Sequence, residues 1–209
     1  MKNILTSLLL CTFIITGCKK EKTTTPKQNE TKKTYYSVDA KNTEVVWTAY
    51  KTTAKTPVKG QFIQLKIDNP IQSTTKQGAL SELNFEIPVS SFFSSNEERD
   101  TKIKNLFFGI MKNTSLISGS FSKVNGNEKA GTVHLNLIMN NETVSVPLTY
   151  KIDNNKIYLE GNINVMDWKI EEAFNSLHKA CETLHTGTDG VSKTWEEVKI
   201  NAVAMLKTN

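Results

Sequence analysis

The sequence predicts an all-β domain over residues 35–209, an antiparallel up-and-down barrel with minor helix. Apolar and polar side chains alternate with a period of two in several segments, short turns join most of these, and two helical stretches interrupt them. Short turns make neighbouring strands antiparallel, and one-sided alternation fits a sheet with one apolar face. Closing so long a sheet removes its exposed edges, so we expect a barrel; a two-sheet sandwich is the alternative.

About eight or nine strands are expected. In the segment FIQLKID, for example, Ile63, Leu65 and Ile67 share one face while the residues between them are polar. The segments with a strand pattern are residues 44–50, 62–68, 82–89, 116–123, 132–139, 143–152, 156–165 and 198–206.

Turn residues and prolines set the limits of these strands. Asn140-Asn141 and the sequence Asp153-Asn154-Asn155 predict hairpin turns, because Asn and Asp tolerate left-handed backbone. Pro88 and Pro147 each lack a backbone donor, so we expect them at a sheet edge or a bulge.

The first helix is predicted within residues 94–111. Ser94 or Ser95 stands three residues before Glu97 or Glu98, the spacing of a capping box. Gly109 is expected to shorten this helix. Its apolar stripe comprises Ile103, Leu106, Phe107, Ile110 and Met111.

The second helix is predicted at residues 168–185, before the last strand, with Gly187 following as a C-terminal stop. A helix with a strong apolar face must pack on another surface, and the mouth of the barrel is the obvious one. The stripe comprises Ile170, Ala173, Phe174, Leu177, Cys181 and Leu184.

The N-terminal segment predicts export and lipidation. Residues 1–17 join a positive start to an apolar run that is too short to span a bilayer and has the length of a signal-peptide core. The sequence ITGC resembles the bacterial lipobox, which implies cleavage after Gly17, diacylglycerol on the sulfur of Cys18 and acylation of its amine. Several acyl chains give stable anchoring. Residues 18–34 carry no large apolar side chain and are expected to be a disordered tether.

This arrangement predicts a protein of the bacterial cell envelope, held on a membrane by its lipid, on the periplasmic or the surface side. The net charge of +5 is modest and its lysines are scattered, so no nucleic-acid partner is expected. Cys181 is the only cysteine left in the folded domain, which excludes an intramolecular disulfide there. The sequence does not decide the oligomeric state.

The order of several short segments resembles the YceI-like family, the bacterial lipocalin-like, polyisoprenoid-binding domains. The segments are YYSVDAKNTEVVWTAYK, VKGQF, EERDTKIKNLFF, GSFSKV and VHLNLIMNNETVSVPLTYKI. The resemblance as a whole covers about residues 36–206. Two features depart from the family pattern. The hairpin at Asn140-Asn141-Glu142 replaces a glycine turn, and the stretch from Trp168 to Trp195 is longer than usual.

The resemblance implies an eight-stranded antiparallel barrel that holds a long apolar molecule, such as an isoprenoid or quinone-like lipid, for sequestration or transport without catalysis. No other cofactor is expected. The helix at residues 103–111 would be the gate, with Phe107 and Phe108 as contacts; alternatively, these rings simply fill the core. The candidate ligand-binding residues are Phe62, Phe85, Ile103, Leu106, Phe107, Phe108 and Phe121.

A metal-binding or redox role is the alternative hypothesis. His178, Cys181 and His185 lie at i, i+3 and i+7 beside the apolar stripe, and imidazole and thiolate are good ligands for zinc or copper. Positions i and i+7 are ~10.5 Å apart along a straight helix, so one ion would not easily meet both histidines. Cys181 with His185 could chelate an ion; otherwise the three are ordinary amphipathic residues near a helix end.

Nothing else in the sequence predicts an enzyme. No acid is placed to orient a Cys-His nucleophile, and there is no glycine-rich phosphate loop, no Gly-x-Ser-x-Gly and no His-Glu-x-x-His. Arg99 and Asp100 are neighbours on a helix and should diverge rather than pair, and Asp100 fits the helix dipole.

Overall fold

The structure, a computed structural model, describes residues 32–209. The predicted signal peptide, Cys18 and nearly all of the predicted tether lie outside this range, so these stay predictions. Within residues 32–209 no helix is long and apolar enough to cross a bilayer. Residues 33–209 form one compact unit, and the whole hydrophobic core lies inside it.

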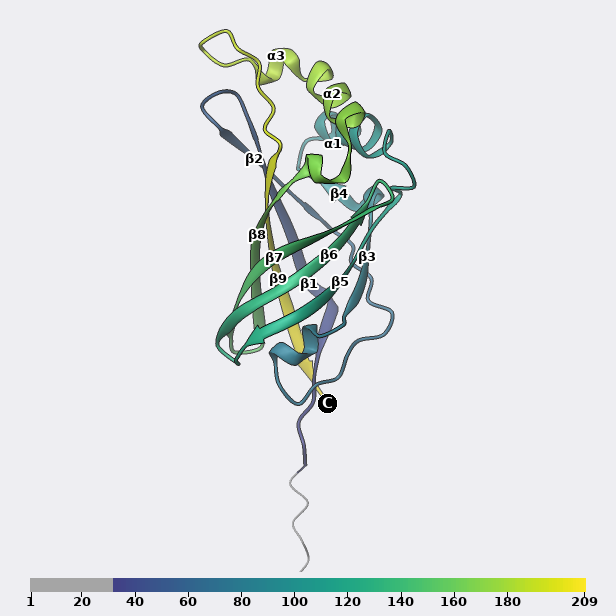
Figure 1. The fold of residues 1–209 in the computed structure, drawn as a ribbon, viewed down its shortest axis with the longest axis vertical. Helices are drawn as coiled ribbons and strands as arrows, with labels where there is room; N and C mark the ends of the chain where they lie inside the picture. Colours follow the sequence, from purple (N-terminus) through teal and green to yellow (C-terminus); the bar gives the residue numbers. More distant parts are fainter. Residues whose placement is uncertain (1–31) are drawn as a thin grey trace, which may run out of the picture. The chain divides into compact units, whose positions relative to one another are not determined.

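One antiparallel sheet of nine strands wraps into a barrel (Figure 1), as predicted. Its strand order is β3-β5-β6-β7-β8-β9-β1-β2-β4, so from β5 to β9 each strand pairs with the next along the chain. The strands are β1 (Tyr36–Lys51), β2 (Thr56–Phe62), β3 (Asn84–Pro88), β4 (Phe92–Phe93), β5 (Leu116–Gly126), β6 (Ala130–Met139), β7 (Glu142–Asp153), β8 (Lys156–Asn164) and β9 (Glu197–Thr208).

The count of nine strands rather than eight has a simple cause. The 3₁₀ turn η2 (Val89–Ser91) divides one bent segment into β3, which pairs with β5, and β4, which pairs with β2. Beyond β2 the backbone of Lys66 bridges that of Glu86, and the amide of Ile63 donates to the carbonyl of Ser91 at 3.0 Å. This corner joins the two ends of the sheet, which excludes the sandwich alternative.

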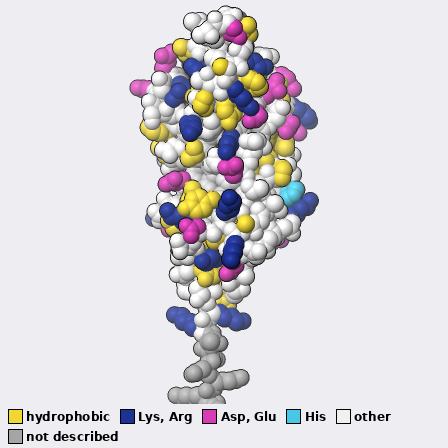
Figure 2. Space-filling model, turned by 90° about the vertical axis from the view of Figure 1, so that its left-hand side faces the viewer, with side chains coloured by type: hydrophobic (Ala, Val, Ile, Leu, Met, Phe, Trp, Pro, Cys, Tyr) yellow, Lys and Arg dark blue, Asp and Glu magenta, His cyan; other side chains and the backbone are white. Residues whose placement is uncertain are grey.

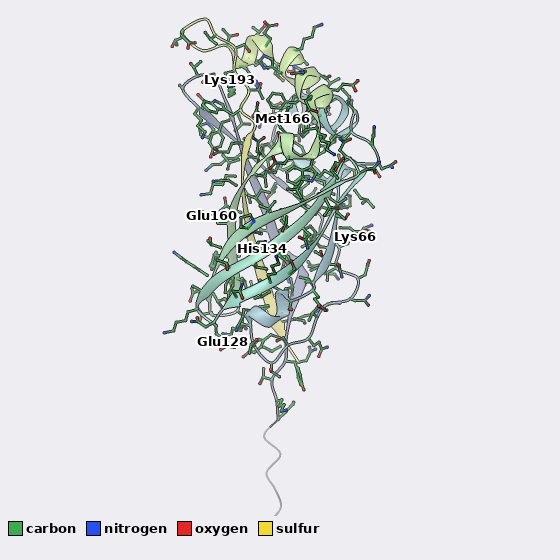
Figure 3. The ribbon with its side chains drawn as sticks, in the orientation of Figure 1. Lys66, Glu128, His134, Glu160, Met166 and Lys193 are labelled. Atoms are coloured by element: carbon green, nitrogen blue, oxygen red, sulfur yellow. The ribbon has the colours of Figure 1, made fainter. Side chains whose placement is uncertain are left out.

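The alternating pattern predicted the inward faces of β3 and β5–β9. On β6, for example, Val133, Leu135 and Leu137 are buried. His134 on β6 and Glu160 on β8 lie on the outer surface of the barrel, as their labels in Figure 3 show. The Asn140-Asn141 turn is also confirmed, with φ of 51° and 61°. Lysines on the face shown in Figure 2 are interspersed with acidic and hydrophobic side chains.

The predicted strand at residues 62–68 is wrong in its bounds. β2 ends at Phe62, and Ile63 is 61% exposed beside a β4 of only two residues. Leu65 and Ile67 are half-buried and still line the interior, which is why the alternation continued past the end of the ladder. The first strand is also longer than predicted, since β1 begins at Tyr36.

Pro147 lies where the ladder between β7 and β8 stops. The pairing of these strands begins at Thr149 and Glu160, while β8 pairs with β9 along its whole length. Pro147 therefore costs no hydrogen bond on that side, in agreement with the prediction of an edge or bulge. Pro88 ends β3 at the corner.

Short helices close the two ends of the barrel. At one end η1 (Gln77–Leu80) buries Ala79 and Leu80 against β1 and β5. At the other end lie α1 (Glu97–Ile103), the π-helical turn η3 (Lys104–Phe108), η4 (Val165–Trp168), α2 (Glu171–Ala180) and α3 (Glu182–His185). Figure 1 shows the labelled helices gathered at that end, where the sequence placed them.

The first helix begins later than predicted. Its N-cap is Asn96, whose side chain accepts from the amide of Arg99 at 2.8 Å, so Ser94 and Ser95 do not cap it. The helix then widens into a π turn and ends at Phe108, followed by Gly109 as expected. A Cβ at Gly109 would stand 2.6 Å from the carbonyl oxygen of Asn105, which explains the glycine.

The second helix is interrupted, which the sequence did not predict. α2 ends at Ala180 and α3 begins at Glu182, while Cys181 between them has φ of −113° and ψ of 7°. Leu184 is 57% exposed, so the predicted apolar stripe stops at Cys181. Before α2, the fully buried Trp168 donates from Nε1 to the carbonyl of Leu137 at 3.0 Å and fixes this segment to β6.

Candidate ligand-binding site

The barrel encloses a cavity of about 220 Å³. Its wall comes from every strand of the barrel and from both covering segments, with Leu80 near η1 and Phe174 and Leu177 on α2. Since about 10–15 Å³ is enough to admit one water molecule, the cavity has room for several. Nearly all of the lining side chains are apolar, so water would gain few hydrogen bonds inside.

Six of the seven predicted ligand-binding residues line this cavity. Leu106 is half-buried in η3 but does not reach the cavity wall. Since a π turn holds more residues than an α turn, the helical wheel misplaced one position of the stripe. The six lining residues are Phe62, Phe85, Ile103, Phe107, Phe108 and Phe121.

Aromatic rings form one continuous group at the corner of the barrel. The ring of Phe92 stacks on Trp47 at 4.8 Å between centroids and contacts Phe62 and Phe108 edge-on at 5.6 Å and 6.0 Å. Phe107 meets Phe108 at 5.2 Å. Phe107 and Phe108 therefore do both things that the sequence left open, because they complete this packing and also form cavity wall.

Gly60 makes room for this aromatic group. It faces Trp47 across the β1–β2 ladder, and a Cβ there would stand 2.2 Å from the indole. The family-like segment VKGQF therefore has a physical reason for its glycine. Sequence reasoning missed Trp47, Phe92 and Thr194 as lining residues, although the alternation around Trp47 carried a usable signal for its face.

The Arg99-Asp100 pair fastens the covering helix to the barrel. Asp100 is buried, and one carboxylate oxygen accepts from the amide of Ser94 at 3.2 Å while the other accepts from the Ser94 hydroxyl. Arg99 donates from Nε to the same hydroxyl at 2.7 Å and from its terminal nitrogen to the Ser94 carbonyl at 2.5 Å. The two side chains do not pair with each other, as predicted, but together they hold Ser94 between β4 and α1.

We expect Asp100→Ala to loosen the cover of the cavity. Removing the carboxylate leaves the buried Ser94 amide without its acceptor, which costs about 1–3 kcal/mol of unfolding free energy. Urea unfolding of both proteins measures this loss. Asp100→Asn, which keeps an acceptor oxygen, should lose less, and equal losses in the two variants would contradict this role for the carboxylate.

The interruption at Cys181 brings the two histidines together. His178 Nδ1 lies 2.8 Å and His185 Nδ1 lies 2.6 Å from the same hydroxyl oxygen, Oγ1 of Thr194. Because the helix is interrupted, the two rings lie closer together than the ~10.5 Å rise of a straight helix would place them. Cys181 is buried nearby, and burial raises the pKa of its thiol against the opposing effect of Lys102 and Lys51.

This arrangement does not resemble a metal centre. Among residues 32–209, no group of three or more His, Cys, Asp or Glu side chains is arranged to hold an ion. The structure joins the two histidines through the hydroxyl of Thr194.

The environment keeps His185 neutral. Burial, with smaller effects from Lys51 and His178, lowers the pKa of His185 from 6.5 to about 4. Between pH 6.5 and 4 the unfolded chain therefore binds a proton at this residue that the folded chain does not, so stability falls as the pH is lowered through this window.

Thermal unfolding at pH 7, 6, 5 and 4 tests this effect against the variant His185→Gln. We expect the melting temperature of the original protein to fall more steeply than that of the variant, and only below about pH 6.5. Parallel curves would show that His185 is not held neutral in the folded state.

An antiparallel barrel with an apolar cavity, covered by helices at one end, has the architecture of the lipocalin-like β-barrels. The sequence matches the profile described as YceI-like domain over residues 36–205. The chain therefore belongs to the YceI-like family, and the resemblance seen in its short segments is confirmed. No curated protein matched the chain.

Solved structures show the same fold at low sequence identity. A polyisoprenoid binding domain from Saccharophagus degradans, implicated in plant cell wall breakdown, has 14% identity and a TM-score of 0.58, covering 83% of this chain and 98% of its own. BcnA of Burkholderia cenocepacia has 16% identity and a TM-score of 0.52, covering 81% and 99%. The YCEI protein of Campylobacter jejuni has 18% identity and a TM-score of 0.53, covering 73% and 85%.

Proposed function

We propose that this protein binds one apolar, isoprenoid-like or other lipid-like chain inside its barrel and carries or sequesters it without chemical change. The cavity carries this proposal, because its wall is apolar from Leu80 at one end to Phe174 and Leu177 at the other. A solved domain of the same fold, that of Saccharophagus degradans, is a polyisoprenoid binding domain, which supports this ligand class.

The energetics of the cavity favour an occupant. An apolar void of this volume forfeits dispersion contacts and, at about 24 cal/mol per Å³, costs on the order of 5 kcal/mol. An apolar chain that enters recovers much of this and leaves water at about 25 cal/mol per Å² of buried surface. Capture therefore needs no covalent chemistry.

We further propose that the protein works in the cell envelope, anchored through Cys18. The apolar run before Cys18, the ITGC sequence and the polar tether after it support this placement. A lipid anchor keeps a binding domain close to a membrane, where isoprenoid chains partition. The domain would then take up its ligand from the membrane to which it is tethered.

Native mass spectrometry of residues 32–209, purified without detergent from the source cells, tests the binding proposal. We expect a mass above that of the polypeptide, and the extra mass should be extractable into organic solvent as an apolar chain. A protein that carries no adduct and also fails to bind added isoprenoids would refute the proposal.

The anchor is tested separately with the full chain. Cells expressing the original protein should show it in the membrane fraction, whereas Cys18→Ser should release it to the soluble envelope fraction. Identical fractionation of the two proteins would contradict the lipid anchor and leave the binding proposal intact.

A further inference from the structure

The hydroxyl of Thr194, at the helical end of the cavity, has different hydrogen-bond partners from the other polar groups of the cavity wall. Among the residues that line the cavity, only Thr43 and Thr194 carry a hydroxyl. Thr43 donates its hydroxyl to the carbonyl of Asp39 in its own strand at 2.8 Å. Trp195 is also occupied, since its Nε1 donates to the carbonyl of Thr52 at 2.8 Å. Thr194 differs, because its partners are two imidazoles.

Thr194 is fixed in position, and its hydroxyl still has one hydrogen-bonding position without a partner. Its backbone bridges that of Lys51, and its Oγ1 is within hydrogen-bond distance of both His178 and His185. A threonine hydroxyl offers one donor and two acceptor positions. Two of these three face the imidazoles, so one remains, either as an acceptor or as a donor according to the tautomers of the histidines.

The surroundings favour a neutral partner for that last position. Burial is the largest cause of the lowered pKa of His185, and burial penalises charge of either sign. Lys51, the nearby cation, already donates from Nζ to the carbonyl of Leu184 at 3.0 Å. Phe174, Leu177 and Trp195 complete an apolar collar around this end of the cavity.

We propose that Thr194, positioned by His178 and His185, is the head-group site of the cavity and binds one neutral hydroxyl or carbonyl oxygen at the end of an apolar chain. This inference rests on the proposed function, since it describes which end of a bound chain lies under α2. It also gives the extended segment between Trp168 and Trp195 a role. That segment supplies the hydroxyl, both imidazoles and the helix that covers them.

Binding of matched probes to residues 32–209, which contain the complete core, tests the inference. The probes are geranylgeraniol, the same chain with hydrogen in place of the hydroxyl, geranylgeranyl phosphate, and a quinone with a short isoprenoid tail. Thr194→Val replaces the hydroxyl by a methyl group of similar size, Thr194→Ser retains the hydroxyl, and Thr132→Val is the control, because Thr132 is exposed on β6 and lies outside the cavity wall.

We expect the alcohol or the quinone to bind the original protein more tightly than the hydrocarbon. Thr194→Val should reduce the affinity for that oxygen-bearing probe about three- to tenfold, which is the effect of one hydrogen bond. Its affinity for the hydrocarbon should be unchanged. Thr194→Ser and Thr132→Val should bind all probes like the original protein. Thr194→Ala repeats the test if valine disturbs the packing.

Other results would overturn the inference in distinguishable ways. Equal binding of the alcohol and the quinone to Thr194→Val and the original protein would remove the head-group site while leaving the proposed function in place. Tightest binding of the phosphate would show that the head is anionic. Failure of every probe to bind the original protein would refute the proposed function itself.

Discussion

Ala202→Phe is expected to abolish most of the binding of an isoprenoid chain, with affinity reduced about tenfold or more. Ala202 faces the cavity from β9, opposite Val45 on β1 and Leu159 on β8. A benzyl group at this position would occupy the middle of the channel, so the chain could enter only by displacing it. Displacement by overpacking typically costs about 1–3 kcal/mol, and 1.4 kcal/mol is a factor of ten in affinity.

The same variant should not lose stability, because the new ring fills a void. Titration of a fluorescent isoprenoid measures the affinity, and thermal unfolding measures the stability. Val203→Phe is the matched control, since Val203 is the next residue on β9 and lies outside the cavity wall. If Ala202→Phe and Val203→Phe bound the probe equally well, the chain would have to bind somewhere else.

Trp168→Ala is expected to destabilise the protein by about 3–5 kcal/mol, the range for a fully buried large aromatic residue. The indole is fully buried, and its loss also leaves the Leu137 carbonyl on β6 without this donor. Since native domains typically have about 5–15 kcal/mol of unfolding free energy, this loss removes a large share of it, and the variant should unfold at a clearly lower denaturant concentration.

Chemical unfolding followed by circular dichroism measures the effect. Trp168→Phe should lose less, because it keeps a ring while removing only the hydrogen bond to Leu137. Tyr158→Ala on the outer face of β8 should change the stability by about 0.5 kcal/mol or less. A Trp168→Ala protein as stable as the Tyr158→Ala protein would show that this indole does not hold η4 to the barrel.

Alternation of apolar and polar residues predicted the inward face well where one face of a strand is buried and the other is not, as on β6 and β7. It failed at residues 62–68 because alternation reports which side chains are buried and says nothing about hydrogen bonding. Leu65 and Ile67 face the interior from a stretch whose only ladder contact is the bridge at Lys66. The bounds of a strand depend on its neighbours, which the local sequence does not contain.

The sequence predicted that apolar side chains form the candidate site, but it did not predict the hydrogen bonds of Thr194 with His178 and His185. Phe85 and Phe121 alternate onto the inner face, so the pattern could place them in the cavity wall. The meeting of His178 and His185 at Thr194 depends on a break at Cys181, and no glycine or proline marks that break. Its origin lies in tertiary packing, since Cys181 is buried while Leu184 after it is exposed.

At the corner formed by β3, η2 and β4, neighbouring strands are joined by fewer paired residues than β6 and β7 are. β6 and β7 are joined along ten residue pairs, whereas β2 and β4 share two, followed by the bridge between Lys66 and Glu86. Parting the wall at this seam breaks fewer backbone hydrogen bonds than parting β6 from β7. Phe62 and Phe92 lie at this seam and line the cavity. A gap between β2 and β4 would therefore connect the apolar interior of the barrel with its side.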